Sequence, residues 1–377
     1  TSEPSSQPES SPTAEPTNEP TNEPASQPSN EPSEEALDAD PYTSLSFEVQ
    51  PDGYGYIDIP IQLSSEATNV LFSLRGADDI VISEVISPQG QLVFDWRDWD
   101  GVDQSYTYAL YVSQSGDCFF NWPIRAEDAE LYEGEWLFSF YTFDASPPAN
   151  LDVDLQIKQD TSYTSGTLDV TIGYTEDVGY TPNFQTTLNE AVAEWERIYS
   201  LYGLSITVST NLVNIPDTLP SPFIGDVEYY TENIQGSDQD ILIVIGDTID
   251  GHPTLLGMSG SVPGPTTEAE SAVVAISWLN AGGADGVFDS IDTRMLGETF
   301  AHEVGHYIGL PHPVESSWSQ YDALSDTPQC SDAGQCEGLF QSNLMFPYPV
   351  CGSQDCVAQD ELTAGQQGVA HRYTGVY

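Results

Sequence analysis

The stretch Phe300–Pro313, FAHEVGHYIGLPHP, decides both the fold and the chemistry of the second half of this 377-residue chain. It holds three of the chain's five histidines, at positions 302, 306 and 312. Side chains four residues apart on a helix project from the same face, one turn above the other. His302 and His306 can therefore direct two imidazole nitrogens toward one metal ion, and the spacing predicts a metal site on a helix.

Three further residues of this stretch extend the prediction. Glu303 follows the first histidine, where its carboxylate can take a proton from a zinc-activated water molecule. Gly309 can adopt the positive φ that ends a helix, and Pro311 discourages the helix from resuming. His312 can then reach the same ion as a third ligand. We predict a zinc site made by the three histidines, with Glu303 as the general base; three ordinary, partly buried histidines are the alternative.

The chain around this motif, from residue 161 to its end, alternates strand and helix patterns. The continuous apolar run ILIVI at 241–245 is typical of a strand buried on both faces. The glycines and prolines of LLGMSGSVPGP at 255–265 are typical of an edge strand. Together the patterns predict an α/β catalytic domain spanning residues 161–377. Its other expected elements are strands at 168–174, 204–208 and 272–278 and helices at 184–202 and 292–310.

The motif HEVGHYIGLPH resembles that of the metzincin clan of zinc peptidases. Downstream, NLMFPY at 343–348 resembles the Met-turn of that clan, with Met345 as the methionine beneath the metal. Its thioether would give the histidine cluster a soft, apolar floor. An ordinary core methionine is the alternative. The resemblance implies a zinc peptidase in which Glu303 acts on a peptide carbonyl.

Within that clan the chain is most similar to the pappalysin (cytophagalysin) family. The similarity rests on the Asp-Thr-Pro segment in DALSDTPQC at 322–330, on cysteines around the Met-turn, and on the closing segment DELTAGQQGVAHRY at 360–373. It covers roughly residues 165–377. It implies that substrate binds as an added antiparallel strand along the edge strand at 255–265.

Two positions near the site complicate the family pattern. In pappalysin-like Met-turns, a tyrosine two residues after the methionine contacts the metal or the transition state, but here Pro347 holds that place, between Phe346 and Tyr348. Tyr348 is therefore either the corresponding catalytic tyrosine or a plain surface aromatic. Glu315 can support an imidazole ligand through a hydrogen bond; its replacing His312 as a zinc ligand is the less favoured alternative.

Four of the five cysteines lie close together near the Met-turn and form either disulfides or a metal knot. We expect disulfides, and hence a protein exported from the cytoplasm. Four cysteines permit three pairings, among which the sequence does not choose; the family resemblance implies Cys330 with Cys351 and Cys336 with Cys356. The fifth, Cys118, is expected to be a buried thiol, with the alternative that it caps the zinc in a latent form.

Residues 43–160 show period-two alternation of apolar and polar residues, broken by turn signals such as PDGYG. With no long helical pattern, this predicts an all-β sandwich, an accessory domain. It loosely resembles the sandwich domains attached to secreted bacterial peptidases. The alternating runs lie at 57–63, 106–112, 136–140 and 151–157.

The N-terminal residues repeat proline at every fourth position from 4 to 32, without an aromatic or basic residue in the first 35. Such a segment has too little apolar surface for burial to offset the conformational entropy that ordering would cost. Residues 1–42 are therefore predicted to be a disordered, Glu/Pro-rich spacer. In exported bacterial proteins such spacers often follow a lipidated N-terminus. The sequence begins at Thr1 without an initiator methionine, so we expect either that a leader was removed or that the sequence was trimmed. A lipid anchor upstream of Thr1 is one expectation.

The chain carries 60 acidic and 7 basic side chains, a net charge of −53. This charge repels phosphate backbones and anionic lipid, so we expect no nucleic-acid partner. No run of 18 apolar residues is present, so no transmembrane segment is expected. The acidic loop GADGVFDSID at 283–292 offers oxygen ligands suited to calcium, with a solvated loop as the alternative.

These observations predict a secreted or surface-tethered zinc-dependent endopeptidase that acts on protein or peptide substrates. The alternative is a catalytically inert surface protein whose β-sandwich binds a glycan or another protein. A zinc hydrolase acting on a non-peptide substrate is a third hypothesis. The presence of Glu303 favours an enzyme, because inert relatives usually lose the base.

Overall fold

The computed structural model describes residues 42–77, 80–96, 117–144, 150–159, 163–220, 241–266, 273–282, 287–352 and 355–377. The chain divides into two units, Thr1–Ala39 and Asp40–Tyr377, and every described residue belongs to the second. The predicted spacer therefore lies outside the described residues, except for Tyr42, which begins the first strand. The strand predicted at 106–112 also lies outside them.

Two four-stranded antiparallel sheets form the first part of the described chain, with strand orders β1-β8-β3-β6 and β2-β7-β4-β5. In β2, every second residue from Ile57 to Leu63 is buried, because alternate side chains of a strand point to opposite faces. The Phe72 ring of one sheet lies 4.7 Å from that of Phe138 and 5.4 Å from that of Phe140 in the other. The sheets thus pack face to face as a β-sandwich, as the alternation predicts. The strands are β1 (Tyr42–Val49), β2 (Tyr56–Leu63), β3 (Asn69–Arg75), β4 (Ile80–Ile86), β5 (Leu92–Asp95), β6 (Asp117–Trp122), β7 (Gly134–Thr142) and β8 (Leu151–Lys158).

A five-stranded sheet follows, with the order β10-β9-β12-β15-β14. Neighbouring strands from β10 to β15 run parallel, and β14 pairs antiparallel with β15 at the edge. Every residue of β12 is buried, as its uninterrupted apolar run predicts. The glycine- and proline-rich segment thus contributes the edge strand expected of it. The strands are β9 (Gly166–Tyr174), β10 (Leu204–Leu212), β12 (Ile241–Gly246), β14 (Gly257–Ser259) and β15 (Val274–Ser277); β11 (Thr218–Leu219) and β13 (Thr248–Ile249) form a separate pair.

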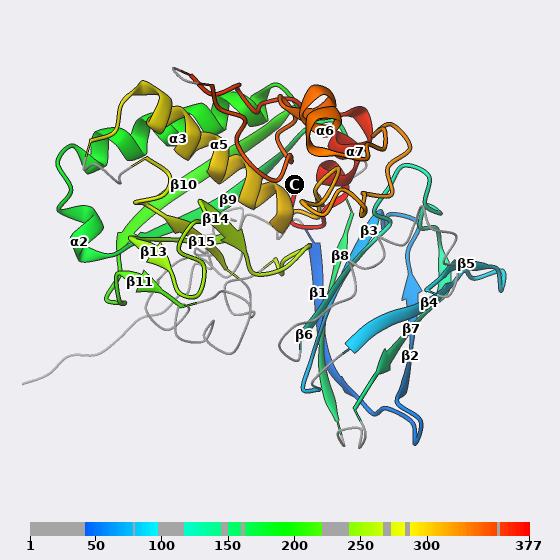
Figure 1. Cartoon of the computed structure of the whole chain (residues 1–377). Helices are drawn as coiled ribbons and strands as arrows, with labels where there is room; N and C mark the ends of the chain where they lie inside the picture. The colour runs from blue at the N-terminus through cyan, green and yellow to red at the C-terminus, as the bar shows by residue number, and fades with distance from the viewer. Residues whose placement is uncertain are drawn as a thin grey trace, which may run out of the picture. The chain divides into compact units, whose positions relative to one another are not determined.

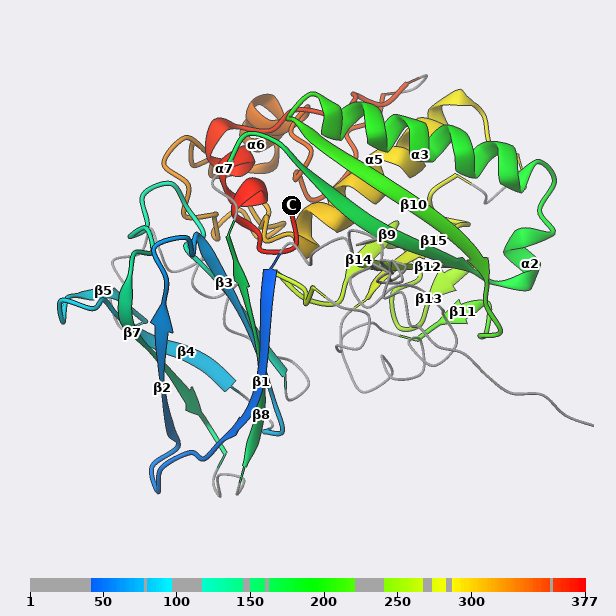
Figure 2. The same cartoon turned by 180° about the vertical axis from the view of Figure 1, so that it is seen from behind.

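Two long helices, α3 (Phe184–Ser200) and α5 (Ser290–Tyr307), lie along the same face of this sheet (Figures 1 and 2). The Trp195 and Phe300 rings are 5.9 Å apart. A Cβ atom at Gly297 would lie only 2.6 Å from the carbonyl oxygen of Ala191, so the two helices approach as closely as a glycine allows. The metal motif therefore sits on a helix that is packed directly against its neighbour.

Local sequence sets both ends of α5. The Asp289 side chain accepts from the backbone amides of Ile291 and Asp292, and the Asp292 side chain accepts from the Asp289 amide, which makes a capping box. The helix ends at Tyr307, and Gly309 has φ +101°, the left-handed turn that the sequence predicts. In the expected calcium loop, the two aspartates thus cap a helix, while residues 283–286 lie outside the described residues.

The remaining helices among the described residues are short: α2 (Glu176–Gly179), α6 (Ala333–Phe340) and α7 (Ala364–Arg372). Two disulfides, Cys330–Cys336 and Cys351–Cys356, lie in this last part of the chain. The expectation that these four cysteines form disulfides is confirmed, but the interleaved pairing implied by the family resemblance is wrong. Cys330 lies just before α6 and Cys336 inside it, with Cα atoms 5.3 Å apart. Cys351 and Cys356 face each other across an antiparallel bridge. Each cysteine is therefore paired with the cysteine nearest to it in the sequence.

Cys118 is buried on β6, in register with Leu74 of β3 inside the sandwich. This position favours the buried-thiol interpretation over a cap on the metal. In the part of the chain that the structure describes, no helix has the length and apolar character needed to cross a membrane.

Candidate metal centre and active site

The three histidines of the motif converge on one point. The Nε2 atom of His312 lies 3.3 Å from that of His302 and 3.1 Å from that of His306. Ligand nitrogens about 2 Å from a tetrahedral zinc ion are about 3.3 Å apart, so this spacing fits zinc. Within the described ranges, no other group of three histidine, cysteine or acidic side chains is placed to hold a metal ion.

The other ring nitrogen of each histidine faces an acceptor. The Nδ1 of His302 lies 2.6 Å from the carbonyl oxygen of Leu344, and that of His306 lies 2.6 Å from that of Leu310. The Nδ1 of His312 lies 3.1 Å from a carboxylate oxygen of its supporting glutamate, residue 315. Because carbonyl and carboxylate oxygens only accept, each Nδ1 carries the proton and each Nε2 keeps its lone pair. Three lone pairs at contact distance repel one another unless a cation lies between them.

Burial keeps the imidazoles of His302 and His306 neutral. It lowers the pKa of His302 to about 3, with a further contribution from the nearby His312. Burial also holds the pKa of His306 well below its usual value, with contributions from the two other histidines. Neutral imidazole is the form that binds a metal, so these two residues are ready to bind zinc across the whole neutral pH range. Glu315 beside His312 is the supporting carboxylate anticipated from the sequence.

Glu303 lies between α5 and the edge strand. Its side chain is buried, which raises its pKa to about 8, and the backbone amide of Ser259 opposes this rise by donating a hydrogen bond. A Cβ atom at Gly257 would lie 2.6 Å from Cγ of Glu303. Glycine at this position therefore lets β14 lie directly against the carboxylate that the sequence assigns as the base.

Met345 is fully buried under the motif helix. Its sulfur lies 2.6 Å from the point where a Cβ atom of Gly305 would be, between the two helical histidines in sequence. The preceding carbonyl, that of Leu344, is the acceptor for His302. The closing segment supports this turn, since Asn343 and Gln366 of α7 exchange side-chain hydrogen bonds of 2.8 and 3.2 Å.

A pocket with a cavity volume of about 170 Å³ opens beside His302 and Glu303. Gln359 and residues of three segments line it: the approach to the edge strand (254–257), one face of α5, and the stretch after Met345 (346–349). Tyr348 is among them, but its hydroxyl donates to the carboxylate of Glu337 at 3.2 Å, and its ring packs 4.8 Å from that of Phe346. Tyr348 thus belongs to the pocket wall, with its hydroxyl engaged by α6.

Sequence reasoning missed Glu298, which lines this pocket one helical turn before His302. Burial raises its pKa to about 7, while the nearby Arg294 and the backbone amide of Gln359 pull the pKa down. The amide donates at 3.2 Å, and the guanidinium Nε lies 3.7 Å away. The spacing of four residues from His302 on the same helix was the signal that could have revealed it. The close contact of Gly257 with Glu303 had no such signal, because β14 and α5 are distant in the sequence and are brought together only by the fold.

No protein-family model and no curated protein sequence matches the chain. Among solved structures it is similar to archaemetzincin from Methanopyrus kandleri, with 12% identity and a TM-score of 0.29 over 55% of this chain and 88% of that one. It is also similar to metalloproteinase-II from Bacteroides fragilis, with 11% identity and a TM-score of 0.31 over 58% of this chain and 61% of that one. Myroilysin gives 12% identity and a TM-score of 0.26 over 56% of this chain and 95% of its own. All three TM-scores lie below 0.5, so these likenesses carry no conclusion about the function of this chain.

Proposed function

We propose that this chain is a zinc-dependent endopeptidase. The observation that carries the proposal is the convergence of three unprotonated Nε2 atoms beside a buried carboxylate and an open pocket. His302, His306 and His312 would hold the ion. Zinc held there acts as a Lewis acid, which polarises a carbonyl group and lowers the pKa of water.

Glu303 is the proposed general base. Its carboxylate takes a proton from the attacking water, and burial then helps it to retain that proton, because burial favours the neutral acid. The same group can pass the proton to the leaving amine as the peptide bond breaks. The Ser259 amide fixes the carboxylate in one position during both steps, so the base does not have to be reoriented.

The edge strand and the pocket provide the proposed substrate site. Among the described residues, β14 pairs with β15 alone, so an extended peptide can add to its other edge as a further antiparallel strand. Such a strand would pass Glu303, which lies against Gly257. The adjacent pocket would then receive one side chain of the peptide. This arrangement favours an internal peptide bond as the substrate over a small non-peptide ester or amide.

We further propose the metzincin clan, and a pappalysin-like subtype, from the long histidine motif, the buried Met345 and the Asp-Thr-Pro segment. The Asp326 carboxylate of that segment accepts from the hydroxyl of Thr363 and the amide of Gly365 at the start of α7, at 3.1 and 2.7 Å. We assign residues 1–42 as a spacer, 43–160 as an accessory β-sandwich and 161–377 as the catalytic domain. The two disulfides support export from the cytoplasm.

The test combines metal removal with substitution of the base. The wild-type chain, the Glu303→Gln variant and a control, Glu196→Gln on the exposed side of α3, are each incubated with casein and gelatin. We expect the wild type and the control to cleave, a chelator to abolish cleavage and added zinc to restore it. Glu303→Gln should bind zinc normally and lose at least about 100-fold in rate.

Two results would contradict the proposal. Cleavage that persists in Glu303→Gln would show that Glu303 is not the general base. A wild-type protein that binds zinc and cleaves neither substrate favours the inert, surface-binding alternative.

A further inference from the structure

Residues 371–374, here called the C-terminal segment, are held against the β-sandwich by buried polar contacts. The side-chain amide of Asn121, on β6, donates to the carbonyl oxygen of Arg372 at 2.9 Å. Its carbonyl oxygen accepts from the amide and the hydroxyl of Thr374, at 3.0 and 2.7 Å. The ammonium group of Lys158 donates to the first carbonyl oxygen of the segment at 3.3 Å. Buried polar groups lose free energy when they are left unbonded, so these contacts fix the backbone of the segment.

Tyr373, inside this segment, continues the connection toward the metal helix. Its hydroxyl lies within hydrogen-bonding distance of the carbonyl oxygens of Gly264 and Pro265, at 3.1 and 2.6 Å. The Gly264 amide donates to the carbonyl oxygen of Tyr307 at 2.7 Å, and a Cβ atom at Gly264 would lie 2.3 Å from the Tyr307 ring. Tyr307 is the last residue of α5 and directly follows His306.

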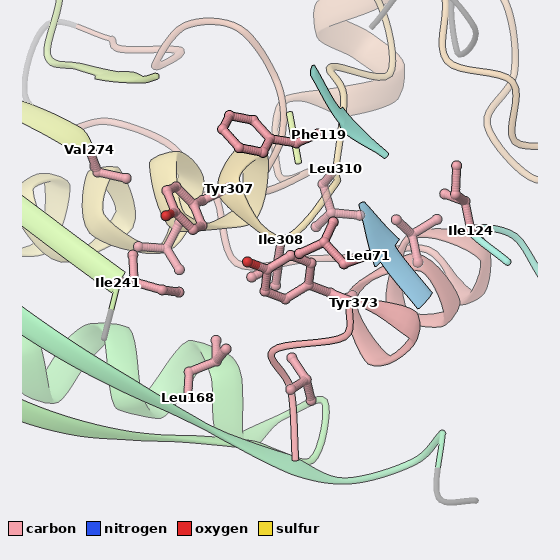
Figure 3. Packing of buried hydrophobic residues seen from close by; sticks show 14 of the residues in the cluster. Leu71, Phe119, Ile124, Leu168, Ile241, Val274, Tyr307, Ile308, Leu310 and Tyr373 are labelled. Carbon is pink, nitrogen blue, oxygen red and sulfur yellow. The ribbon is translucent and has the colours of Figure 1, made fainter. Parts of the chain in front are cut away.

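An apolar contact runs beside these hydrogen bonds. Leu310 accepts from His306 through its carbonyl oxygen, and its side chain is 1% exposed. That side chain belongs to the same buried cluster as Leu71 and Phe119 of the sandwich and Tyr373 of the C-terminal segment (Figure 3). The loop between His306 and His312 is therefore packed in part against residues of the sandwich.

We infer that the β-sandwich, acting through Asn121 and the C-terminal segment, positions the end of α5 and the turn that carries His312. Asn121 and Tyr373 are thus positioning residues for the metal site, although neither touches the three histidines. The physical reason is geometric. His306 directly precedes Tyr307, and the loop to His312 follows it. The carbonyl oxygen of Tyr307 is hydrogen-bonded to Gly264, which Tyr373 of the C-terminal segment holds. This inference rests on the metal site of the proposed function.

The experiment measures zinc binding directly, in the full chain. Zinc dissociation constants are obtained by competition with a chromophoric chelator for the wild type, Asn121→Ala, Tyr373→Phe and the double variant. Ser83→Ala is the control, because its buried hydroxyl donates to the Ser139 carbonyl oxygen at 2.8 Å within the other sheet. The visible spectrum of bound cobalt(II) reports ligand geometry, and thermal unfolding reports stability.

Supporting residues of a metal site typically change affinity 10- to 100-fold, so we expect about a tenfold weaker affinity in Asn121→Ala and in Tyr373→Phe. The double variant should lose less than the product of the two single losses, because both act along one path. The cobalt spectrum should change in these variants, while Ser83→Ala keeps the wild-type affinity and spectrum. If Asn121→Ala and Tyr373→Phe lower the unfolding temperature but bind zinc within twofold of the wild type, the inference is overturned. Failure of the wild type itself to bind zinc would instead refute the proposed function.

Discussion

Replacing Gly257 by alanine should damage catalysis without removing the metal site. The new Cβ atom would lie 2.6 Å from Cγ and 3.0 Å from Cδ and Oε1 of Glu303. Ordinary contact begins at 3.4 Å, so Cγ has to move by about 0.8 Å. A displacement of about 1 Å in a catalytic group can cost about 100-fold in rate. We therefore expect kcat for peptide cleavage to fall by about that factor, with the zinc dissociation constant unchanged.

The assay follows cleavage of a fluorogenic peptide, with zinc content measured on the same samples. Gly338→Ala, on α6, is the matched control because its added methyl group meets no atom within 4 Å. A folded Gly257→Ala protein with kcat within threefold of the wild type would show that β14 does not constrain Glu303. A loss of zinc together with activity would place the damage in the histidine cluster instead of at the base.

Three other predictions concern support of the metal, pH dependence and the cysteines. Glu315→Gln replaces the carboxylate that faces His312, and zinc competition should show an affinity about tenfold weaker, whereas an unchanged affinity would deny this residue its supporting role. In the folded protein Glu298 has a pKa of about 7, above the usual 4.5, so the folded state holds this proton more tightly than the unfolded state. The free energy of unfolding should therefore fall as the pH rises from about 4.5 toward 7, by up to about 3 kcal/mol from this residue. Urea unfolding at pH 5 and pH 8 should show a smaller pH difference in Glu298→Gln, and an equal difference in both proteins would assign the effect elsewhere. Peptide mapping without reduction should recover Cys330 linked to Cys336 and Cys351 linked to Cys356, and breaking either short loop should cost about 2 kcal/mol of stability; interleaved peptides would contradict the structure.

Features set by local spacing could be predicted from the sequence. The offset of four between His302 and His306 needs only helix geometry, and the turn after them needs only the freedom of Gly309. The hydrogen bond from His312 to Glu315 spans three residues, so it too lies within reach of sequence reasoning. The strands at 57–63, 136–140, 151–157 and 241–245 followed for the same reason, since alternation or continuous burial is present in each of these runs of residues.

Features that depend on where distant segments meet could not be predicted in this way. The disulfide pairing could not be predicted either, although the paired cysteines are only six and five residues apart, because three pairings satisfy the same sequence and only the folded structure selects between them. The contact between Gly257 and Glu303 depends on the edge strand meeting α5, and the Asn121 contacts join residues about 250 positions apart. The pocket carboxylate of Glu298 lay within the predicted helix, but only the fold shows that this face lines a cavity.

The close packing of α5 limits which residues of this protein can be substituted during evolution. A methyl group at Gly297 meets the backbone of α3, and one at Gly305 meets the sulfur of Met345, so that wall of the cavity tolerates little change. Leu255 and Pro347 also line the pocket, and they lie outside the helices. Natural drift in cleavage preference should therefore accumulate in those two stretches, and a directed-evolution library seeking new selectivity should randomise them while leaving the helix untouched.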